Sequence, residues 1–398
     1  MRATFAGERR ARILVIPSEP NHSNPDGDAP SAPRRVLMLS PRSTVSGPIP
    51  KITSLLLEPL RAAGCDVTLE PWGRHSDTES IADKILGRVR DIVRVRSRVA
   101  GAGFDVMIVK TSHEWMSLLR DVPLAAVTRR HVPVIVAEFH GGNAERLAAP
   151  GHRAFKWFTK RLFRLIDGAF VLSSEEADIA SSFHPQGTFR LIVNPFQSSE
   201  PDGASPPREP GSVPMVLFAG RLLPEKGVLD TVEAFALLHA RRPCKLVIAG
   251  AGPAAEDVAA RVAELGLSDS VSLAGLLSHD ELWAVYRAAD VFVLPTYWGE
   301  GFPTVLAEAM SAGLPIVTTK LRGSADHLED GVNALFVPPR APSELADAIG
   351  RLLDDEELRG RMSAANRVKV RDFEPVKAAE IYVRALADMV PRTASQSA

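Results

Sequence analysis

The stretch DVFVLPTYWGEGFPTVLAEAMSAGLPIVTT (290–319) has the pattern of one strand–helix–strand unit. Two apolar runs, 290–295 and 314–319, have the composition of strands that are buried on both faces. Between them the pattern predicts a helix over about 303–312. Pro303 lies in the expected first turn, where its missing N–H removes no helix hydrogen bond. This order of elements is typical of a parallel α/β sheet.

The same alternation of short apolar runs and helical stretches extends in both directions. In the second half of the chain we expect strands at 213–220, 244–250, 270–275, 290–295, 314–319 and 333–337. The intervening helices are expected at 227–241, 253–265, 279–288, 303–312 and 342–353. In the first half we expect strands at 34–40, 66–70, 104–110, 132–138, 168–173 and 189–194, with helices around 49–63, 79–99 and 150–166.

Two doubly wound α/β domains follow from this pattern, over 34–196 and 213–372. Residues 197–212, QSSEPDGASPPREPGS, carry four prolines and no periodicity, and they are expected to be a linker. The Pro-, Asn- and Asp-rich start, 1–33, is expected to be a disordered tail. Residues 373–398 are expected to form a last amphipathic helix followed by a tail. Open sheets of this kind bind ligands beyond the carboxyl ends of their strands.

Composition narrows the class of protein. The formal net charge is −1, so no global field attracts nucleic acid, and we expect no nucleic-acid partner. No run is long enough to cross a bilayer. Cys65 and Cys244 are the two cysteines, and they have no metal-ligand spacing. We therefore expect a soluble protein in the cytoplasm.

The loop after the 290–295 run carries the strongest candidate chemistry. Gly301, Phe302, Pro303 and Thr304 lead into a helix, whose unpaired N–H groups and dipole favour a diphosphate. Glu300 ends the loop and could accept hydrogen bonds from sugar hydroxyls. Glu308, two helical turns on, could reach a ribose. The structural alternative is a surface Glu and a helix Glu on either side of buried residues.

A second candidate follows the first strand of the second domain, in GRLLPEKG (220–227). Arg221 and Lys226 place two cations near one strand end, which suits a diphosphate and would stabilise its charge as it leaves. Flanking glycines allow a close approach of the ligand. The structural alternative is an exposed pair of charges at the start of a helix.

Together with LEDGVNALFVPP (328–339), these motifs resemble glycosyltransferase family 4. The resemblance covers most of 34–390 and is tightest in 213–340. It implies the GT-B fold, in which two Rossmann-like domains face one another across a cleft. It also implies a metal-independent enzyme that retains anomeric configuration, uses a nucleotide sugar as substrate and has no other cofactor. The final helix is expected to cross back to the first domain.

The resemblance also implies roles for residues of this chain. Arg221 and Lys226 are expected to hold the donor diphosphate, Glu300 the donor sugar and Glu308 the ribose. The backbone around the start of the helix is expected to cradle sugar and phosphate, through Gly301, Phe302, Pro303, Thr304 and Val305.

The first domain departs further from the family pattern. Its first loop, SPRSTVSGPIPK (40–51), has the single Gly47 where the family has a glycine pair, and Gly47 is the candidate for approaching the donor phosphates. His140, in AEFHGG (137–142), follows a strand and could donate a hydrogen bond near the reacting centre. Gly141 and Gly142 are expected to leave space beside it. A structural histidine is the alternative.

IAGAGPAA (248–255) matches the Gly-x-Gly-x-x-Ala fingerprint of dinucleotide-binding proteins. The next strand ends in Ala274 and Gly275, so the acidic residue that would bind a ribose is missing. Pro253 also removes one N–H from the phosphate cradle. We interpret this stretch as a tight strand–helix turn and do not expect NAD.

The helix HRAFKWFTKRLFRL (152–165) carries Arg153, Lys156, Lys160 and Arg164 beside an apolar stripe, with Trp157 and Phe163 largely outside that stripe. An earlier helix repeats the basic theme with Arg90, Arg94 and Arg98. These helices are either packed on the core with solvated basic faces, or they form a peripheral membrane patch for a lipid-linked acceptor.

The leading hypothesis is a hexosyltransferase that moves a sugar from a UDP- or GDP-sugar to a glycan, lipid-linked or small-molecule acceptor. A nucleotide-sugar epimerase with the GT-B fold and a non-catalytic nucleotide-sugar-binding protein remain as alternatives.

Overall fold

The computed structural model describes residues 35–45, 47–76, 81–142, 144–198, 212–299 and 301–390. The expected tail 1–33, residues 199–211 of the expected linker, and Glu300 lie outside the described residues. The chain divides into two compact units. Unit 1 comprises residues up to Pro195 together with those from Pro375 onward, and unit 2 comprises Phe196–Glu374.

Unit 1 is built on a six-stranded sheet in the order β2-β1-β3-β4-β5-β6. All neighbouring strands are parallel. The strands are β1 (Arg35–Ser40), β2 (Asp66–Pro71), β3 (Val106–His113), β4 (Val134–Gly142), β5 (Gly168–Val171) and β6 (Phe189–Leu191). The helices are α1 (Pro48–Ala62), α2 (Ile81–Ala102), α3 (Trp115–Thr128), α4 (Glu145–Ala148), α5 (Arg153–Phe163), α6 (Ser174–Phe183) and α14 (Pro375–Ala387).

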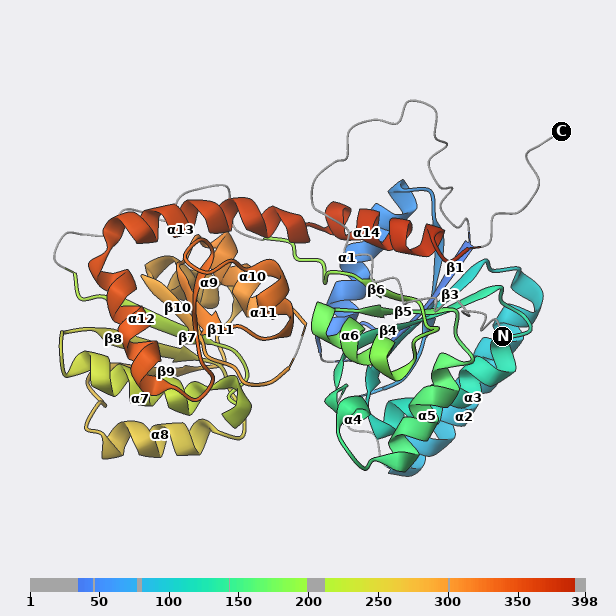
Figure 1. Ribbon diagram of the computed structural model, residues 1–398, viewed down its shortest axis with the longest axis horizontal. Helices are drawn as coiled ribbons and strands as arrows, with labels where there is room; N and C mark the ends of the chain where they lie inside the picture. Colours follow the sequence, from blue (N-terminus) through green and yellow to red (C-terminus); the bar gives the residue numbers. More distant parts are fainter. Residues whose placement is uncertain are drawn as a thin grey trace, which may run out of the picture. The chain divides into compact units, whose positions relative to one another are not determined.

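The period of two along each strand sends alternate side chains to opposite faces of this sheet. Leu37 and Val109 pack with α2 and α3, whereas Glu138 meets Tyr382 of α14. α14 also packs along α1 on that face (Figure 1). The last helix of the chain is therefore part of unit 1.

Unit 2 has a second parallel six-stranded sheet, in the order β12-β11-β10-β7-β8-β9. Its strands are β7 (Met215–Ala219), β8 (Lys245–Ala249), β9 (Val271–Gly275), β10 (Val291–Leu294), β11 (Ile316–Thr319) and β12 (Ala334–Val337). Its helices are η1 (Pro224–Lys226), α7 (Val228–His239), α8 (Ala255–Glu264), α9 (His279–Ala288), α10 (Thr304–Ser311), α11 (Arg322–His327), α12 (Pro342–Asp354), α13 (Glu356–Lys369) and η2 (Val370–Phe373).

Each sheet has one point at which the direction of winding reverses. In unit 1 this switch lies between β1 and β3, and in unit 2 it lies between β7 and β10. Loops that leave neighbouring strands in opposite directions leave room for a ligand there. The predicted parallel α/β architecture is thus confirmed, and the sheet order points to the loops after β7 and β10.

Several helices were not predicted from the sequence. α3 contains Pro123 and is apolar on its outer as well as its inner side, so it lacks a clear amphipathic pattern. α6, α11 and α13 were also missed, and α11 is only six residues long. The expectation for Phe163 was wrong: its side chain is buried and meets Phe189 edge-on, with ring centroids 5.3 Å apart.

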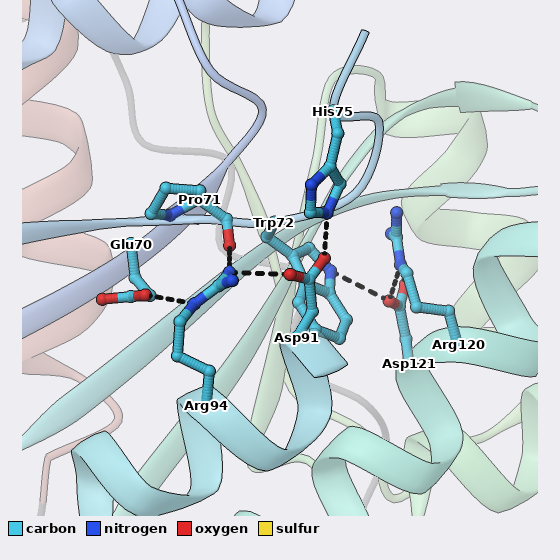
Figure 2. A network of polar contacts seen from close by, with 8 residues as sticks. All are labelled: Glu70, Pro71, Trp72, His75, Asp91, Arg94, Arg120 and Asp121. Atoms are coloured by element: carbon cyan, nitrogen blue, oxygen red, sulfur yellow. Dashed lines mark hydrogen bonds and ion pairs between the residues drawn. The ribbon is translucent and has the colours of Figure 1, made fainter. Parts of the chain in front are cut away.

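A network of ion pairs anchors α2 to the end of β2 (Figure 2). Arg94 donates to Glu70 at 2.7 Å and to the carbonyl of Pro71, and it pairs with the buried Asp91. His75 lies 2.8 Å from the other oxygen of Asp91. Arg94 is therefore held at the sheet and does not belong to an open basic stripe with Arg90.

Candidate functional site

The loop after β7 is held in place by the turn after β8. A Cβ at Gly250 would lie 1.9 Å from the carbonyl oxygen of Gly220, and one at Gly252 would lie 2.4 Å from that of Leu222. The N–H of Leu222 also donates to the Ala251 carbonyl at 3.0 Å. Gly250 and Gly252, which match the dinucleotide fingerprint, therefore allow the turn after β8 to lie against the backbone of the loop after β7.

This turn leaves Arg221 on the surface of unit 2. Its side chain is exposed and pairs with no acidic group among the described residues. Lys226 ends the short helix η1 and is half-buried. Gly227 follows with φ of 73°, a conformation that favours glycine, and starts α7.

The loop after β10 is bonded directly to this turn. The N–H of Tyr297 donates to the carbonyl of Glu225 at 2.9 Å, and the hydroxyl of Thr296 donates to the same oxygen at 3.1 Å. A Cβ at Gly227 would lie 2.3 Å from the Pro295 carbonyl oxygen, so only glycine permits this approach. The two motif loops, distant in sequence, therefore lie side by side at the switch point of the sheet.

The start of α10 is the helix end that the sequence predicted to meet a diphosphate, and that role stays a prediction. Gly301, Phe302 and Pro303 are buried, and Thr304 at the first helical position is exposed. Among the described residues no side chain caps this end of the helix, and the first N–H groups of a helix are those that can meet an anion. Pro303 has an extended backbone and directly precedes the helix, one position earlier than expected.

Glu308 accepts a hydrogen bond from a residue that the sequence motifs did not indicate. The Tyr286 hydroxyl, on α9, donates to Glu308 Oε2 at 2.9 Å. Burial, followed by the neighbouring Glu308 carboxylate, raises the pKa of Tyr286 well above its ordinary value, so Tyr286 stays a neutral donor. The spacing of apolar residues in α9 could have identified Tyr286 as buried but not as the partner of Glu308.

Arg322 and Gly323 support the loop between β10 and α10. Arg322 is buried, has φ of 41° and donates through Nη1 to the Gly299 carbonyl at 2.6 Å. A Cβ at Gly323 would lie 2.5 Å from the nitrogen of Phe302. A positive φ at an arginine costs free energy that the surrounding contacts must offset. No sequence pattern pointed to either residue.

Phe302 fixes the same loop from the other side. Its ring stacks on Phe373 with centroids 4.5 Å apart and an interplanar angle of 12°, and His327 meets both rings edge-on. Burial is the main cause that lowers the pKa of His327 to about 4. The imidazole is therefore neutral at pH 7 and packs as an aromatic ring.

In unit 1, Gly47 lies where β1 leads into α1. It has φ of 137° and precedes the first residue of α1, and a Cβ added there would have no atom of the described residues within 4 Å, its chain neighbours apart. The Ser40 and Thr53 hydroxyls, 2.9 Å apart, tie the end of β1 to α1. Gly47 is thus an open backbone position at the switch point of this sheet, as a ligand-binding glycine requires.

His140 belongs to a buried polar cluster in unit 1. Its Nε2 lies 2.7 Å from Glu138 Oε1, which also accepts from the Tyr382 hydroxyl at 2.7 Å and from Lys110. Burial raises the pKa of Glu138, but Lys110 and His140 outweigh it and bring that pKa to about 2. Burial is also the largest cause that lowers the pKa of His140. A role for His140 at a reacting centre stays a prediction.

The glycines after His140 differ from expectation. Gly141 has open space around it, but a Cβ at Gly142 would lie 2.6 Å from the nitrogen of His113. Gly142 therefore permits the close approach of β4 to β3 and does not open space beside His140.

Within the described part of the chain, no cluster of three or more His, Cys, Asp or Glu side chains could hold a metal ion. None of the helices described is long and apolar enough to cross a membrane.

Comparison with known proteins identifies part of the chain. Residues 204–369 match the family model described as Glycosyl transferases group 1. Alpha-D-kanosaminyltransferase of Streptomyces kanamyceticus is 37% identical over 178 residues, which are 44% of this chain and 44% of that protein. The match therefore spans less than half the length of this relative.

Two solved structures resemble the whole of the described fold. The apo form of the lipopolysaccharide outer core galactosyltransferase WaaB has a TM-score of 0.67 at 18% identity, over 89% of this chain and 99% of that one. HepE of Anabaena, in complex with UDP and glucose, has a TM-score of 0.66 at 15% identity, over 88% of this chain and 99% of that one. Together with the two parallel sheets, these structural matches show a two-domain Rossmann-like GT-B fold, and the match to the glycosyl transferases group 1 model is confined to residues 204–369.

Proposed function

We propose that the protein is a glycosyltransferase that moves a hexosyl group from a UDP- or GDP-sugar to a glycan, lipid-linked or small-molecule acceptor. One observation carries the proposal: the backbone bond from Tyr297 to Glu225 joins the loop of Arg221 and Lys226 to the loop that starts α10. Two cations and a helix N-terminus thereby share the switch point of one sheet, which is where open α/β sheets bind nucleotides.

The donor diphosphate is assigned to Arg221 and Lys226. Arg221 offers planar paired donors and Lys226 a compact positive charge. As the bond from the sugar to the phosphate breaks, the leaving nucleoside diphosphate gains negative charge, and both cations stabilise it. We propose that this pair supplies the charge stabilisation and that the reaction needs no metal or further cofactor.

The two carboxylates are assigned to opposite ends of the donor. Glu308, which accepts from Tyr286, is proposed to accept from the ribose hydroxyls. Glu300 precedes Gly301 and is proposed to accept from the hydroxyls of the sugar. The backbone of Gly301, Phe302, Pro303, Thr304 and Val305 is proposed to cradle the sugar and the phosphates.

Unit 1 is proposed to contribute Gly47 to the donor phosphates and His140 to the reacting sugar. The GT-B fold and the motif resemblance support these two roles. Retention of anomeric configuration is proposed on the same ground. We place the activity in the cytoplasm, in keeping with two buried free thiols, Cys65 and Cys244.

The comparisons suggest which donors to try first. HepE of Anabaena was solved with UDP and glucose, and UDP-glucose is therefore one candidate donor. A relative named for transfer of kanosamine adds amino sugars to the set. Both choices are proposals for this chain.

A donor and acceptor screen tests the proposal. Release of UDP or GDP is measured with each donor, and the product is examined by NMR to read its anomeric configuration. An α-linked product from an α-linked donor is expected. A free epimer formed from donor alone would identify an epimerase, and binding without release under any condition would identify a nucleotide-sugar-binding protein.

The site assignment needs its own control. A variant with Arg221 and Lys226 both changed to Ala is expected to release no nucleotide above background. A variant with Arg287 and Arg351 both changed to Ala removes two exposed arginines elsewhere in unit 2, and it is expected to keep wild-type activity.

A further inference from the structure

Three helices of unit 1, α2, α3 and α5, form one layer over the sheet. α3 packs against both α2 and α5, and Trp115 of α3 meets Phe155 and Phe158 of α5 edge-on. The outer surface of this layer carries large apolar side chains that solvent reaches: Leu86, Val89 and Val93 of α2, Met116 and Leu119 of α3, and Trp157 of α5.

The outer side of α3 has no charge along most of its length. Met116, Leu119, Pro123 and Ala126 are exposed and recur every three or four residues, so they lie on one side of the helix. Met116 is 61% exposed and Leu119 is 48% exposed, while the opposite side is buried in the core. Soluble proteins rarely leave such an apolar stripe uncovered unless it binds something.

Cations border this stripe on both sides. α5 has no acidic residue, and among the described residues none pairs with its Arg153, Lys160 or Arg161, or with Arg164 directly after it. On α2, Arg90, Arg96 and Arg98 are exposed and likewise unpaired within the described part of the chain. Arg94, in contrast, is withdrawn to Glu70 and Asp91 (Figure 2).

We propose that the outer surface of α2, α3 and α5 binds the surface of an anionic membrane. Apolar side chains bordered by Lys and Arg match the lipid boundary and its negative headgroups. Trp157, 62% exposed on α5, has the amphipathic ring that favours this boundary. A second copy of the chain fits less well, because a symmetric contact would bring the same cations together.

The proposal differs from the basic patch that the sequence suggested. That patch consisted of basic residues of 152–165 and of the helix with Arg90, Arg94 and Arg98, whereas the structure adds the uncharged stripe of α3 and the exposed valines of α2 and withdraws Arg94 from the surface. It also stands apart from sugar transfer, since membrane binding can be measured without donor or acceptor.

Co-sedimentation with vesicles tests the proposal. The full chain is mixed with vesicles of phosphatidylcholine alone or with phosphatidylglycerol, at low and high salt. Binding is expected with phosphatidylglycerol at low salt and is expected to weaken at high salt, because salt screens the attraction. Changing Lys160, Arg161 and Arg164 to Ser is expected to lower the partition coefficient on the order of a hundredfold, at about fivefold per cation.

The apolar part is tested separately. Brominated phosphatidylglycerol is expected to quench tryptophan fluorescence, and Trp157→Phe is expected to remove most of that quenching. A variant with Met116 and Leu119 changed to Ser is expected to weaken binding even at low salt. Circular dichroism melting confirms that each variant is folded.

Matched controls lie in unit 2. Arg287, Arg351 and Arg371 changed together to Ser, and Leu276→Ser on its own, are expected to bind vesicles as the wild type does. The proposal is overturned by an absence of binding to phosphatidylglycerol vesicles at low salt. Equal losses of vesicle binding in the control variants and in the α5 variant would also overturn it. A third contrary result would be a protein that does not bind vesicles but self-associates, with the Met116 and Leu119 changes abolishing that self-association.

Discussion

The proposed roles of Glu308 at the ribose and Glu300 at the sugar can be separated by single substitutions. Glu308→Ala is expected to lower the affinity for free nucleoside diphosphate by roughly 1.5–3 kcal/mol, the range for a hydrogen bond to a charged group. Glu300→Gln is expected to leave that affinity unchanged and to reduce the rate of transfer. Calorimetric titration and product assays measure both effects. Equal losses of nucleotide affinity in the two variants would contradict the division.

Tyr286 gives a finer test of the Glu308 assignment. Tyr286→Phe removes the hydroxyl that orients the Glu308 carboxylate, and it is expected to weaken nucleotide binding by about 1 kcal/mol. Nucleotides with a deoxyribose are the control. If Glu308 binds the ribose hydroxyls, Glu308→Ala should bind ribose and deoxyribose nucleotides alike, and a retained preference for ribose would exclude this role.

The short helix α11 supports the loop between β10 and α10, which is proposed to bind the donor. Gly323→Ala places a methyl group 2.5 Å from the nitrogen of Phe302, so the loop must move and donor affinity is expected to fall at least tenfold, or about 1.4 kcal/mol. Gly360→Ala, in α13 with no atom within 4 Å, is the matched control and should bind donor normally. Normal binding by Gly323→Ala would show that the loop is not held as described.

His327 makes the same region sensitive to acid. Its pKa is about 4 in the folded protein, mainly through burial, against 6.5 for an ordinary histidine. Between these values the unfolded chain takes up a proton that the folded protein does not, so stability falls as pH drops from 6.5 to 4. The loss reaches about 3 kcal/mol.

His327→Phe keeps an aromatic ring against the stacked rings of Phe302 and Phe373 and removes the proton site. The free energy of unfolding of this variant, measured by denaturant titration at several pH values, is expected to depend less on pH between 6.5 and 4. An unchanged pH dependence would mean that His327 is not the group that titrates.

At the scale of the whole molecule, the last helix returns to unit 1. α14 buries Tyr382 against the sheet, and Asp388 lies 3.3 Å from Arg190 of β6. Tyr382→Phe removes the hydroxyl bond to Glu138 and is expected to destabilise unit 1 by roughly 1.5–3 kcal/mol. Hydrogen exchange along α14 and thermal unfolding measure this change. Protection of α14 equal to that of the wild type would show that the bond contributes nothing.

The architecture was readable from the sequence because its strands are buried on both faces. Runs such as 290–295 and 314–319 stand out against the helices, and the structure confirms the parallel sheets. The sequence did not reveal the switch-point contacts of Gly227, because close backbone approaches join residues far apart in the chain. Tyr286 was missed for the same reason.

Polar partners explain the other differences. Arg94 looks like part of a basic stripe when only helical spacing is considered, but Glu70 and Asp91 bind it. Arg322 adopts a positive φ that a sequence pattern would assign to glycine. Local periodicity carries no information about such contacts, which depend on the tertiary arrangement.

We propose that the loops joined by the bond from Tyr297 to Glu225 bind the donor diphosphate. The most direct test is calorimetric titration of UDP and GDP into the wild type, Arg221→Ala and Lys226→Ala, with Arg351→Ala as the control. Each site variant is expected to lose roughly 1.5–3 kcal/mol for the preferred nucleotide, since each removes one charge-assisted contact. The control is expected to bind as the wild type does. Unchanged affinity in both site variants would show that the diphosphate does not bind at these two loops.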